Sequence, residues 1–422
     1  MQAIVVFVSF AVLALPSSGG ATTLNVRDVV RQGLVFHPTL QSAQAAIQQA
    51  EGEKLTAISP TSPVLAVERE GVPRGGSLSE YGEQRIAISQ ELEFPLKSVW
   101  RASSARTGVA ASRQNAIAQL LDLEAEIRGT FTEAYLLDQK VTLLTENVEA
   151  VRVYSTQLER MVELGEAVPL EARRARVEYL QAKSLLDAVS NERFAVRTRL
   201  GRLTGMDLNA ATLESPGGED VTTKSAPVDA TLSENPDLRA ATLGAEQSAT
   251  DLQIARFGWL PDLEVSYFQQ KAPAEPKPDF WGVEVGLSLP IWFWLGGRGE
   301  IESSSARRRA SSAELANLRL EAASELDRLT QSINALRESY RLYQSEVAPA
   351  AKEAYDLAMR SFRLGEANYL QVLDAQRSAL GVQMDLIEVQ GELSINLVEL
   401  DRLTGRSLLG ADELQNLLNK GK

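Results

Sequence analysis

The 422-residue sequence contains no cysteine and a single histidine, His37. Without cysteine there are no disulfides, no thiolate metal ligands and no cysteine nucleophile, and we expect no lipid-bearing N-terminal cysteine. A single histidine does not supply a histidine-rich metal site, and we find no nucleophile–base pair. His37 precedes a proline, which predicts a helix boundary rather than a metal ligand. We therefore expect no enzyme, no metal and no cofactor.

Positive charge and long apolar runs are also scarce. The 43 Lys and Arg residues against 56 Asp and Glu residues give a net charge of −13, which argues against nucleic acid as a partner. One apolar run, Ile4 to Leu15, leads into small residues ending at Ala21. It is too short for a spanning helix and predicts a signal peptide over residues 1–21, with a buried N-terminal strand as the alternative. Because no other run is longer, any membrane span must be a barrel.

Two short motifs each occur twice at one spacing. Leu164-Gly165-Glu166-Ala167 returns as Leu364-Gly365-Glu366-Ala367, an offset of 365 − 165 = 200 residues. Arg202-Leu203-Thr204-Gly205 returns at the same offset as Arg402-Leu403-Thr404-Gly405. These coincident matches indicate an internal duplication. We interpret each LGEA motif as the tip of a helical hairpin and each RLTG motif as the end of its returning arm.

In each half the hydrophobic period changes to two before the hairpin begins. Apolar and polar residues alternate within 263–267 and within 281–289, and more weakly within 64–94. This pattern predicts a β-hairpin in each half, at about 62–94 and about 262–290. Strands of about nine to eleven residues fit tilted transmembrane β-strands.

All five tryptophans lie beside these strands, as an aromatic girdle at the membrane interfaces requires. The alternative is that the tryptophans fill the core of a small soluble sheet. The residues are Trp100, Trp259, Trp281, Trp292 and Trp294.

Long helical patterns fill most of the remaining chain. Apolar residues recur at steps of three, four and seven, the seam of a coiled coil. The pattern from Lys97 to Leu164 covers about 68 positions, or ~100 Å of helix at ~1.5 Å per residue. Pro349 interrupts the second pattern and predicts a kink or break, whereas Glu149 at the equivalent position predicts a straighter first helix.

The predicted organisation has two repeats joined by a linker rich in Gly, Pro, Ser, Thr and Asp. The hairpin tips are expected at about 163–169 and about 363–369. The segments are a signal peptide (1–21), a first repeat (22–208), a linker (209–231), a second repeat (232–408) and a C-terminal tail (409–422).

This ordered set of features resembles the TolC-like outer-membrane efflux family over essentially all of the mature length. The resemblance is carried by the duplication, the phrase Gly286-Leu287-Ser288-Leu289-Pro290, the tip followed by Gln371-Val372-Leu373-Asp374-Ala375, and RLTG at the end of each half. His37-Pro38-Thr39-Leu40 and its counterpart Asn235-Pro236-Asp237-Leu238 complete it.

The resemblance implies a mainly α fold with a small membrane β part. In a homotrimer, four strands per chain would close a 12-stranded transmembrane β-barrel, and the duplicated helical hairpins would form an α-barrel tunnel through the periplasm. Such a channel, in the outer membrane of a Gram-negative-type cell and in contact with its lipid, passively conducts substrates. It receives them from an inner-membrane pump through a periplasmic adaptor, the membrane fusion protein. The pattern is also similar to the branch paired with heavy-metal or cation pumps of the RND type (CzcC-like or CusC-like).

The resemblance further implies a periplasmic gate just beyond the hairpin tips. Matched by motif, the gate positions are Asp374 and Gln371 in the second half and Glu171 in the first. Gln371 stands where the family usually has an acid. Three copies of Asp374 around an axis would favour cations. An ordinary exposed helix residue is the alternative for Asp374.

The tips themselves are expected to dock the adaptor, because small and apolar residues at an exposed turn suggest a partner surface. A plain turn with leucine covering the hairpin end is the alternative. The residues are Leu164, Gly165, Glu166, Leu364, Gly365 and Glu366.

Two other classes of protein compete with the channel. A periplasmic adaptor also has helical hairpins, but usually one hairpin rather than two halves with strands. A soluble coiled-coil scaffold would not place its tryptophans beside alternating strands. The glycine-rich segment Leu295–Gly299 lacks the Gly-Lys-Ser/Thr of a phosphate-binding loop, so we interpret it as a strand-to-helix junction.

Overall fold

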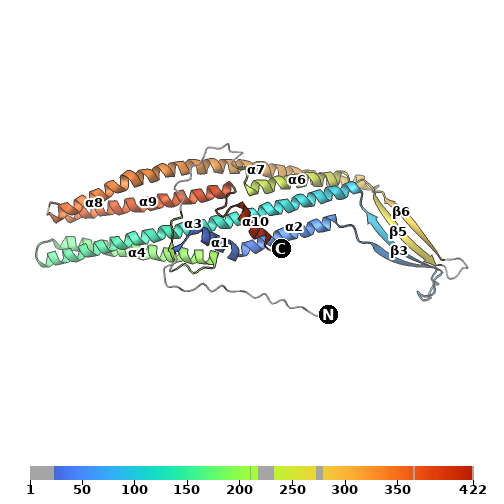
Figure 1. Ribbon diagram of the computed structural model, residues 1–422, viewed down its shortest axis with the longest axis horizontal. Coiled ribbons are helices and arrows are strands. Elements are labelled where there is room, and N and C mark those ends of the chain that lie inside the picture. The colour runs from blue at the N-terminus through green and yellow to red at the C-terminus, as the bar shows by residue number, and fades with distance from the viewer. Residues whose placement is uncertain (1–22, 210, 217–231, 272–278, 365, 421–422) are drawn as a thin grey trace.

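The computed structural model describes residues 23–209, 211–216, 232–271, 279–364 and 366–420. The chain forms a long rod of helices with a β-sheet at one end (Figure 1). The mainly α fold with duplicated long hairpins and four strands beside them is confirmed. The predicted signal peptide lies outside the described residues, as does most of the predicted linker.

Each half contributes an approach helix, two strands of the large sheet and a long helical hairpin. The first half contains β1 (Thr23–Leu24), α1 (Val26–Phe36), α2 (Pro38–Ile58), β2 (Val64–Glu70), β3 (Glu83–Leu92), α3 (Pro95–Glu163), α4 (Pro169–Thr204) and β4 (Thr212–Leu213). The second contains α6 (Pro236–Arg256), β5 (Asp262–Lys271), β6 (Phe280–Ser288), α7 (Phe293–Leu342), η1 (Tyr343–Val347), α8 (Ala348–Arg363), α9 (Tyr369–Leu403) and α10 (Ala411–Asn419).

The approach helices begin at the proline motifs seen in the sequence. His37 is the N-cap of α2, and its Nδ1 accepts a hydrogen bond from the Thr39 N–H at 3.4 Å. Asn235 is the N-cap of α6 and accepts a hydrogen bond from the Leu238 N–H at 2.9 Å. Each cap satisfies a donor that the first helical turn leaves free. The interpretation of His37 as a helix boundary is therefore confirmed.

The longest helix organises the rest of the chain. α3 has 69 residues and, at ~1.5 Å per residue, is ~100 Å long. α4 returns along the part of α3 that is far from the sheet, whereas α2 and α6 pack along the part near it (Figure 1). Several shorter helices are therefore needed to cover one long one.

The main hydrophobic core lies around the middle of α3. Phe131 of α3, Leu34 of α1 and Leu200 of α4 are fully buried there. A second, smaller cluster joins α7 and α9 around Leu329 and Ile333. The core is thus a series of seams between helices, as the coiled-coil spacing predicts.

Pro349 does not break the second long helix. α7 passes into the π-helical turn η1, and α8 follows directly at Ala348. The N–H of Ala348 donates to the carbonyl oxygen of Tyr343, five residues earlier. Because the bonding shifts to this wider spacing just before Pro349, the helix accommodates a residue without an N–H and continues. The predicted break is therefore wrong, because the helix continues through a π turn, whereas the predicted kink stays a prediction.

The two halves merge in one antiparallel sheet of order β2-β3-β5-β6. The central pair joins β3 of the first half to β5 of the second, from Gln84 opposite Lys271 to Leu92 opposite Leu263. β2 and β6 are the outer strands. A second, two-stranded sheet pairs β1 with β4 in parallel, near the middle of the rod.

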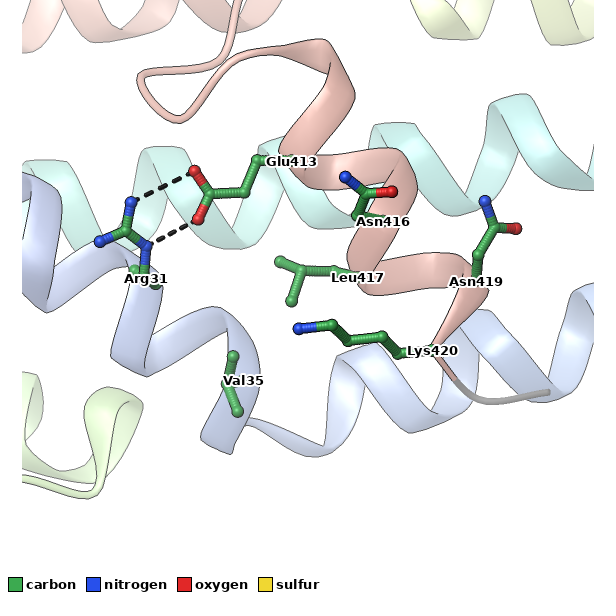
Figure 2. Close-up of a pocket in the computed structure, with 7 residues that line it drawn as sticks. All are labelled: Arg31, Val35, Glu413, Asn416, Leu417, Asn419 and Lys420. Atoms are coloured by element: carbon green, nitrogen blue, oxygen red, sulfur yellow. Dashed lines mark hydrogen bonds and ion pairs between the residues drawn. The ribbon is translucent and has the colours of Figure 1, made fainter.

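The C-terminal helix ties the second half back onto the first. In Figure 2, Glu413 of α10 accepts two hydrogen bonds from Arg31 of α1, at 2.6 and 3.2 Å. The Gln44 side chain donates to the carbonyl oxygen of Leu417 at 2.8 Å. A cavity of about 430 Å³ beside these contacts is also lined by Lys420.

A buried carboxylate anchors the segment that leads into α10. Glu124 of α3 accepts hydrogen bonds from the Ser407 hydroxyl and the Leu408 N–H, each at 2.6 Å. Burial raises the pKa of Glu124, and these two hydrogen bonds partly oppose that rise. Arg128 lies 3.6 Å from Glu124 and pairs with Asp401 of α9 at 2.8 Å. The end of the second repeat is therefore fixed to the middle of α3.

Candidate functional site

One face of the large sheet is apolar and exposed. Cross-strand partners share a face, so the register places Leu65, Ile88, Tyr267 and Val283 in one row. Neighbouring rows add further apolar side chains, interrupted by Gln90 and Gln269. The additional members are Val67, Ile86, Leu92, Leu263, Val265, Trp281, Val285 and Leu287. Water is a poor solvent for such a continuous face, which marks a surface for a partner or a membrane.

The opposite face is polar and slightly hollow. A cavity of about 210 Å³ lies on it, between β2 and β6. Arg85 pairs there with Glu284 at 2.5 Å, and its guanidinium lies 4.0 Å from the centre of the Phe268 ring. The lining residues are Ala66, Glu68, Arg85, Ala87, Ser89, Glu264, Ser266, Glu284 and Gly286. The four strands thus form an amphipathic wall with one apolar and one charged side.

The two edges of this wall are open within the described chain. β2 pairs only with β3, and β6 pairs only with β5, so each outer strand has a row of backbone groups facing away from the sheet. Such edges pair readily with further strands. Four strands with two open edges are therefore suited to continue into neighbouring sheets.

A partly buried ion pair fixes the sheet to the helices. The Lys97 ammonium of α3 donates to both carboxylate oxygens of Asp262, each at 3.0 Å. The same carboxylate accepts the Phe94 N–H at 2.9 Å. Asp262 begins β5 and Phe94 is the N-cap of α3, so this contact sets the angle between the wall and the rod.

The tryptophans lie at two levels of the sheet. Trp259 precedes β5, Trp292 caps α7 and Trp100 packs on Phe257 with ring centres 4.8 Å apart, all at the helical end. Trp281 is instead the second residue of β6, near the opposite end, so it lies within a strand rather than beside one. The side chain of Trp294 lies outside the described part of the chain. The girdle assignment stays a prediction.

Both hairpin tips have the same backbone design. Gly165 has a φ of +77°, and the Glu166 N–H reaches back to the carbonyl oxygen of Met161 at 2.8 Å. At the second tip the Glu366 N–H makes the equivalent bond to Ser361 at 2.9 Å, while Gly365 lies outside the described residues. Leu164 and Leu364 are each 73% exposed. Neither leucine covers its hairpin end, which weakens the plain-turn alternative.

The three predicted gate residues do not share one environment. Asp374 is exposed on α9, and Glu171 is partly exposed in the first turn of α4. The side-chain oxygen of Gln371 accepts the Asn368 N–H at 3.1 Å, and Asn368 accepts the Gln371 N–H at 3.0 Å. Gln371 thus completes a capping box, which gives this position a structural role.

Contacts between the two hairpins near their tips were not found from the sequence. The Tyr154 hydroxyl donates to the Met359 sulfur at 2.8 Å, and the Gln376 amide donates to Asn147 at 2.8 Å. Burial raises the pKa of Tyr154 to about 12. The coiled-coil spacing shows which residues form a seam but not which seams meet.

An ion pair and an apolar cluster complete the contact between the hairpins. Arg377 of α9 donates to both carboxylate oxygens of Glu178 of α4, one turn beyond Asp374. Leu158 and Ala175 of the first hairpin pack with Tyr369 and Leu373 of the second. The ends of the hairpins are therefore held together at the level of the predicted gate.

The described residues lack two other kinds of site. None of the helices in the described ranges combines the length and the hydropathy of a membrane-spanning segment. Among the same residues, His, Asp and Glu side chains form no group of three suited to hold a metal ion.

Residues 228–406 match the protein family described as outer membrane efflux protein. The cobalt-zinc-cadmium resistance protein CzcC of Cupriavidus metallidurans is 25% identical over 326 residues, which are 75% of this chain and 76% of that protein. The pyoverdine export outer membrane protein OpmQ of Pseudomonas putida is 22% identical over 82% of this chain and 78% of its own. The crystal structure of the outer membrane protein VceC of Vibrio cholerae has a TM-score of 0.76 at 20% identity and covers 90% of this chain and 96% of that chain.

Proposed function

We propose that three copies of this chain assemble into one continuous conduit. The chain belongs to the outer membrane efflux protein family, as the channel component of tripartite efflux systems. Four strands from each copy form a 12-stranded barrel in the outer membrane, and the six hairpins form a tunnel through the periplasm. The alternatives of an adaptor or a scaffold are set aside with this membership.

The amphipathic sheet is the observation that carries this proposal. Its apolar face suits lipid, its charged face suits a water-filled lumen, and its open edges at β2 and β6 suit pairing with the next copy. A closed barrel removes both edges and satisfies their backbone groups.

Substitutions on the two faces of one strand test this arrangement. Val265 and Glu264 are neighbours in β5, with Val265 on the apolar face and Glu264 on the charged face. Val265→Lys is expected to destabilise the barrel by ~2–4 kcal/mol, because a lysine faces the hydrocarbon. Glu264→Lys, the matched control, is expected to leave a detergent-extracted trimer in the outer-membrane fraction. Equal loss of trimer from both variants would contradict the proposed orientation.

We further propose that the tips dock a periplasmic adaptor linked to an inner-membrane pump. Exposed Leu164 and Leu364 support this, together with the repeated turn geometry. The sequence has no cysteine, so Glu166→Cys or Glu366→Cys introduces a unique thiol for cross-linking to a co-expressed adaptor. Both are expected to cross-link, whereas Glu192→Cys on α4, far from the tip, is not. Cross-linking at Glu192 alone would place the adaptor elsewhere.

Asp374 is proposed as the acidic ring of the gate, on the support of its exposure one turn from the Arg377–Glu178 pair. Asp374→Asn is expected to weaken block by divalent cations in single-channel recordings, because the ring loses three charges. Glu388→Gln, an exposed change further along α9, serves as the control. If divalent cations block Asp374→Asn as strongly as the unchanged protein, Asp374 does not belong to the gate. Gln371 and Glu171 are proposed only as neighbours of that ring.

The pump is proposed to be of the RND type, with heavy-metal cations as the substrate class to test first. The name of the Cupriavidus metallidurans relative, a cobalt-zinc-cadmium resistance protein, supports this choice. A deletion strain is expected to become sensitive to cobalt, zinc or cadmium and to recover with the gene supplied in trans. Sensitivity to organic compounds alone would point to another branch.

A further inference from the structure

An apolar cavity of about 600 Å³ lies where the second half of the sheet meets the helices. Its lining residues come from the turn before β5 and from the segment that runs from the end of β6 to the first residue of α7. No charged side chain is among them. They are Trp259, Leu289, Pro290, Ile291 and Phe293. The volume is within the ~300–1,000 Å³ range of ligand sites, and the lining suits a hydrocarbon group.

The back wall of the cavity depends on two glycines. The Phe293 ring lies against Gly258 at the end of α6 and against Gly297 in α7. A Cβ on Gly258 would lie 3.2 Å from the ring, and a Cβ on Gly297 would overlap it. Gly296, one residue away, has no atom within 4 Å of its Cβ position. The Phe293 ring therefore occupies space that a side chain on Gly297 would need.

The cavity is continuous with the apolar face of the sheet. Leu289 follows Leu287 by two residues and extends the same alternation beyond β6. Leu289, Ile291 and Trp292 are at least 64% exposed, so the rim remains open in one chain. The cavity thus lies at the level where the membrane-facing wall ends and the periplasmic helices begin.

Two basic residues lie close in sequence to the residues that line the cavity. Arg256 is in the last turn of α6, three residues before Trp259, and Arg298 follows Phe293 by five residues in α7. Both are exposed. A chain with a net charge of −13 therefore has two exposed arginines within five residues of the lining of its apolar cavity. An apolar slot beside cationic groups complements a molecule with a hydrocarbon tail and an anionic head.

We propose that this cavity binds one acyl chain of an anionic phospholipid from the periplasmic leaflet, with the phosphate beside Arg256 and Arg298. The inference rests on the proposed orientation of the apolar face toward lipid. Each trimer then has three such lipids, fixed at the boundary between barrel and tunnel. The lipid fills space that would otherwise leave Trp259 and Phe293 against water.

Quenching of tryptophan fluorescence tests the site, because Trp259 lines it. Delipidated trimer in detergent micelles is titrated with phosphatidylglycerol that has dibrominated acyl chains. The expected quenching has a saturable component that disappears in Trp259→Phe. Gly297→Ala is expected to weaken that component about tenfold, because the added methyl displaces the Phe293 ring, which lines the cavity. Gly296→Ala, the matched control, is expected to bind as the unchanged protein does.

Three outcomes would overturn the proposal. Quenching that never saturates, or that is equal in Gly297→Ala and Gly296→Ala, would indicate bulk lipid only. A Gly297→Ala protein that dissociates into monomers would show that a second copy of the chain fills the cavity. Failure of the proposed channel itself is distinguishable, because the unchanged protein would then form no detergent-extracted trimer in the first place.

Discussion

The two long helical arms of the chain differ more than their shared motifs suggest. In the first arm, α3 runs for 69 residues without interruption and is covered by α1, α2, α4 and α6. In the second, α7, η1 and α8 form one arm with a π turn, and neither η1 nor α8 has a buried residue. The first arm is the scaffold of the single chain, whereas the second presents its outer side to solvent.

This difference bears on assembly. Leu320, Leu342 and Leu357 of the second arm are exposed in one chain. In a tube of three copies, the uncovered arm of one chain is the surface available to its neighbour. Duplication has therefore produced two arms with the same ends and different partners, one inside the chain and one proposed between chains.

The largest expected effect comes from removing core side chains in the two arms. Phe131→Ala is expected to cost ~3–5 kcal/mol, because Phe131 is fully buried in the large cluster. Ile333→Ala is expected to lower the free energy of unfolding by an amount at the lower end of ~2–5 kcal/mol, because its cluster is smaller. Thermal unfolding of the detergent-solubilised protein measures both. Leu320→Ala is the exposed control, and a loss from it comparable to that of Ile333→Ala would mean that a second copy buries Leu320.

Exchanging the residues that distinguish the arms should have unequal effects. Glu149→Pro is expected to cost ~3 kcal/mol or more, because α3 has no π turn at that point to accommodate the missing N–H. Pro349→Glu is expected to change stability by less than ~1 kcal/mol, because η1 has already shifted the bonding. Far-UV circular dichroism during thermal unfolding gives the comparison. Losses of equal size would show that the π turn has no accommodating role.

Two glycines with positive φ allow the cost of backbone strain to be compared with the cost of a steric clash. Gly165 at the first tip and Gly205 at the end of its returning arm have φ values of +77° and +71°. Gly165→Ala is expected to cost ~1 kcal/mol, since only the backbone is strained. Gly205→Ala is expected to cost ~2–3 kcal/mol, because its Cβ would also lie 2.6 Å from the Phe36 ring. Denaturant midpoints measure the difference, and equal midpoints would show that Phe36 moves freely.

The smallest effect concerns the pH dependence of the link between the halves. Burial raises the pKa of Glu124 above its ordinary value of 4.5. Glu124 therefore has a higher pKa in the folded chain than in the unfolded chain. At a pH between these two values, the folded chain binds a proton that the unfolded chain has released. The free energy of unfolding is therefore greatest below the unfolded pKa and declines as pH rises through the folded pKa. Glu124→Gln is expected to remove this decline, because glutamine does not titrate. Its amide oxygen can still accept the hydrogen bond from the Leu408 N–H. Denaturant midpoints at several pH values measure it.

Glu163→Gln, at the exposed end of the same helix, is the control for that experiment. Its midpoints are expected to follow those of the unchanged protein at each pH. A Glu124→Gln protein that retains the full decline would assign the pH dependence to other groups.

Much of the fold was predictable because its signals are local. The change from period two to heptad spacing located the strands and the long helices, and the repeated LGEA and RLTG motifs located their ends. Pro38 and Pro236 marked helix starts, since proline fits the first helical position. Predictions for the site were less complete. Motif position predicts the tip leucines and Asp374 as site residues, and these remain predictions, but it does not predict the capping role of Gln371.

By itself, then, the sequence determined the element types, the duplication and the two-faced strands, because each depends on residues that are neighbours along the chain. Only the tertiary structure decided that β3 pairs with β5, that Tyr154 meets Met359, that Glu124 holds the C-terminal segment and that Pro349 is absorbed by a π turn. These contacts join residues far apart in sequence, or depend on how a helix relaxes against its surroundings. The hydrophobic period along a helix or strand shows which side chains form an apolar face. Which other face it packs against depends on all the apolar faces that the folded chain brings together.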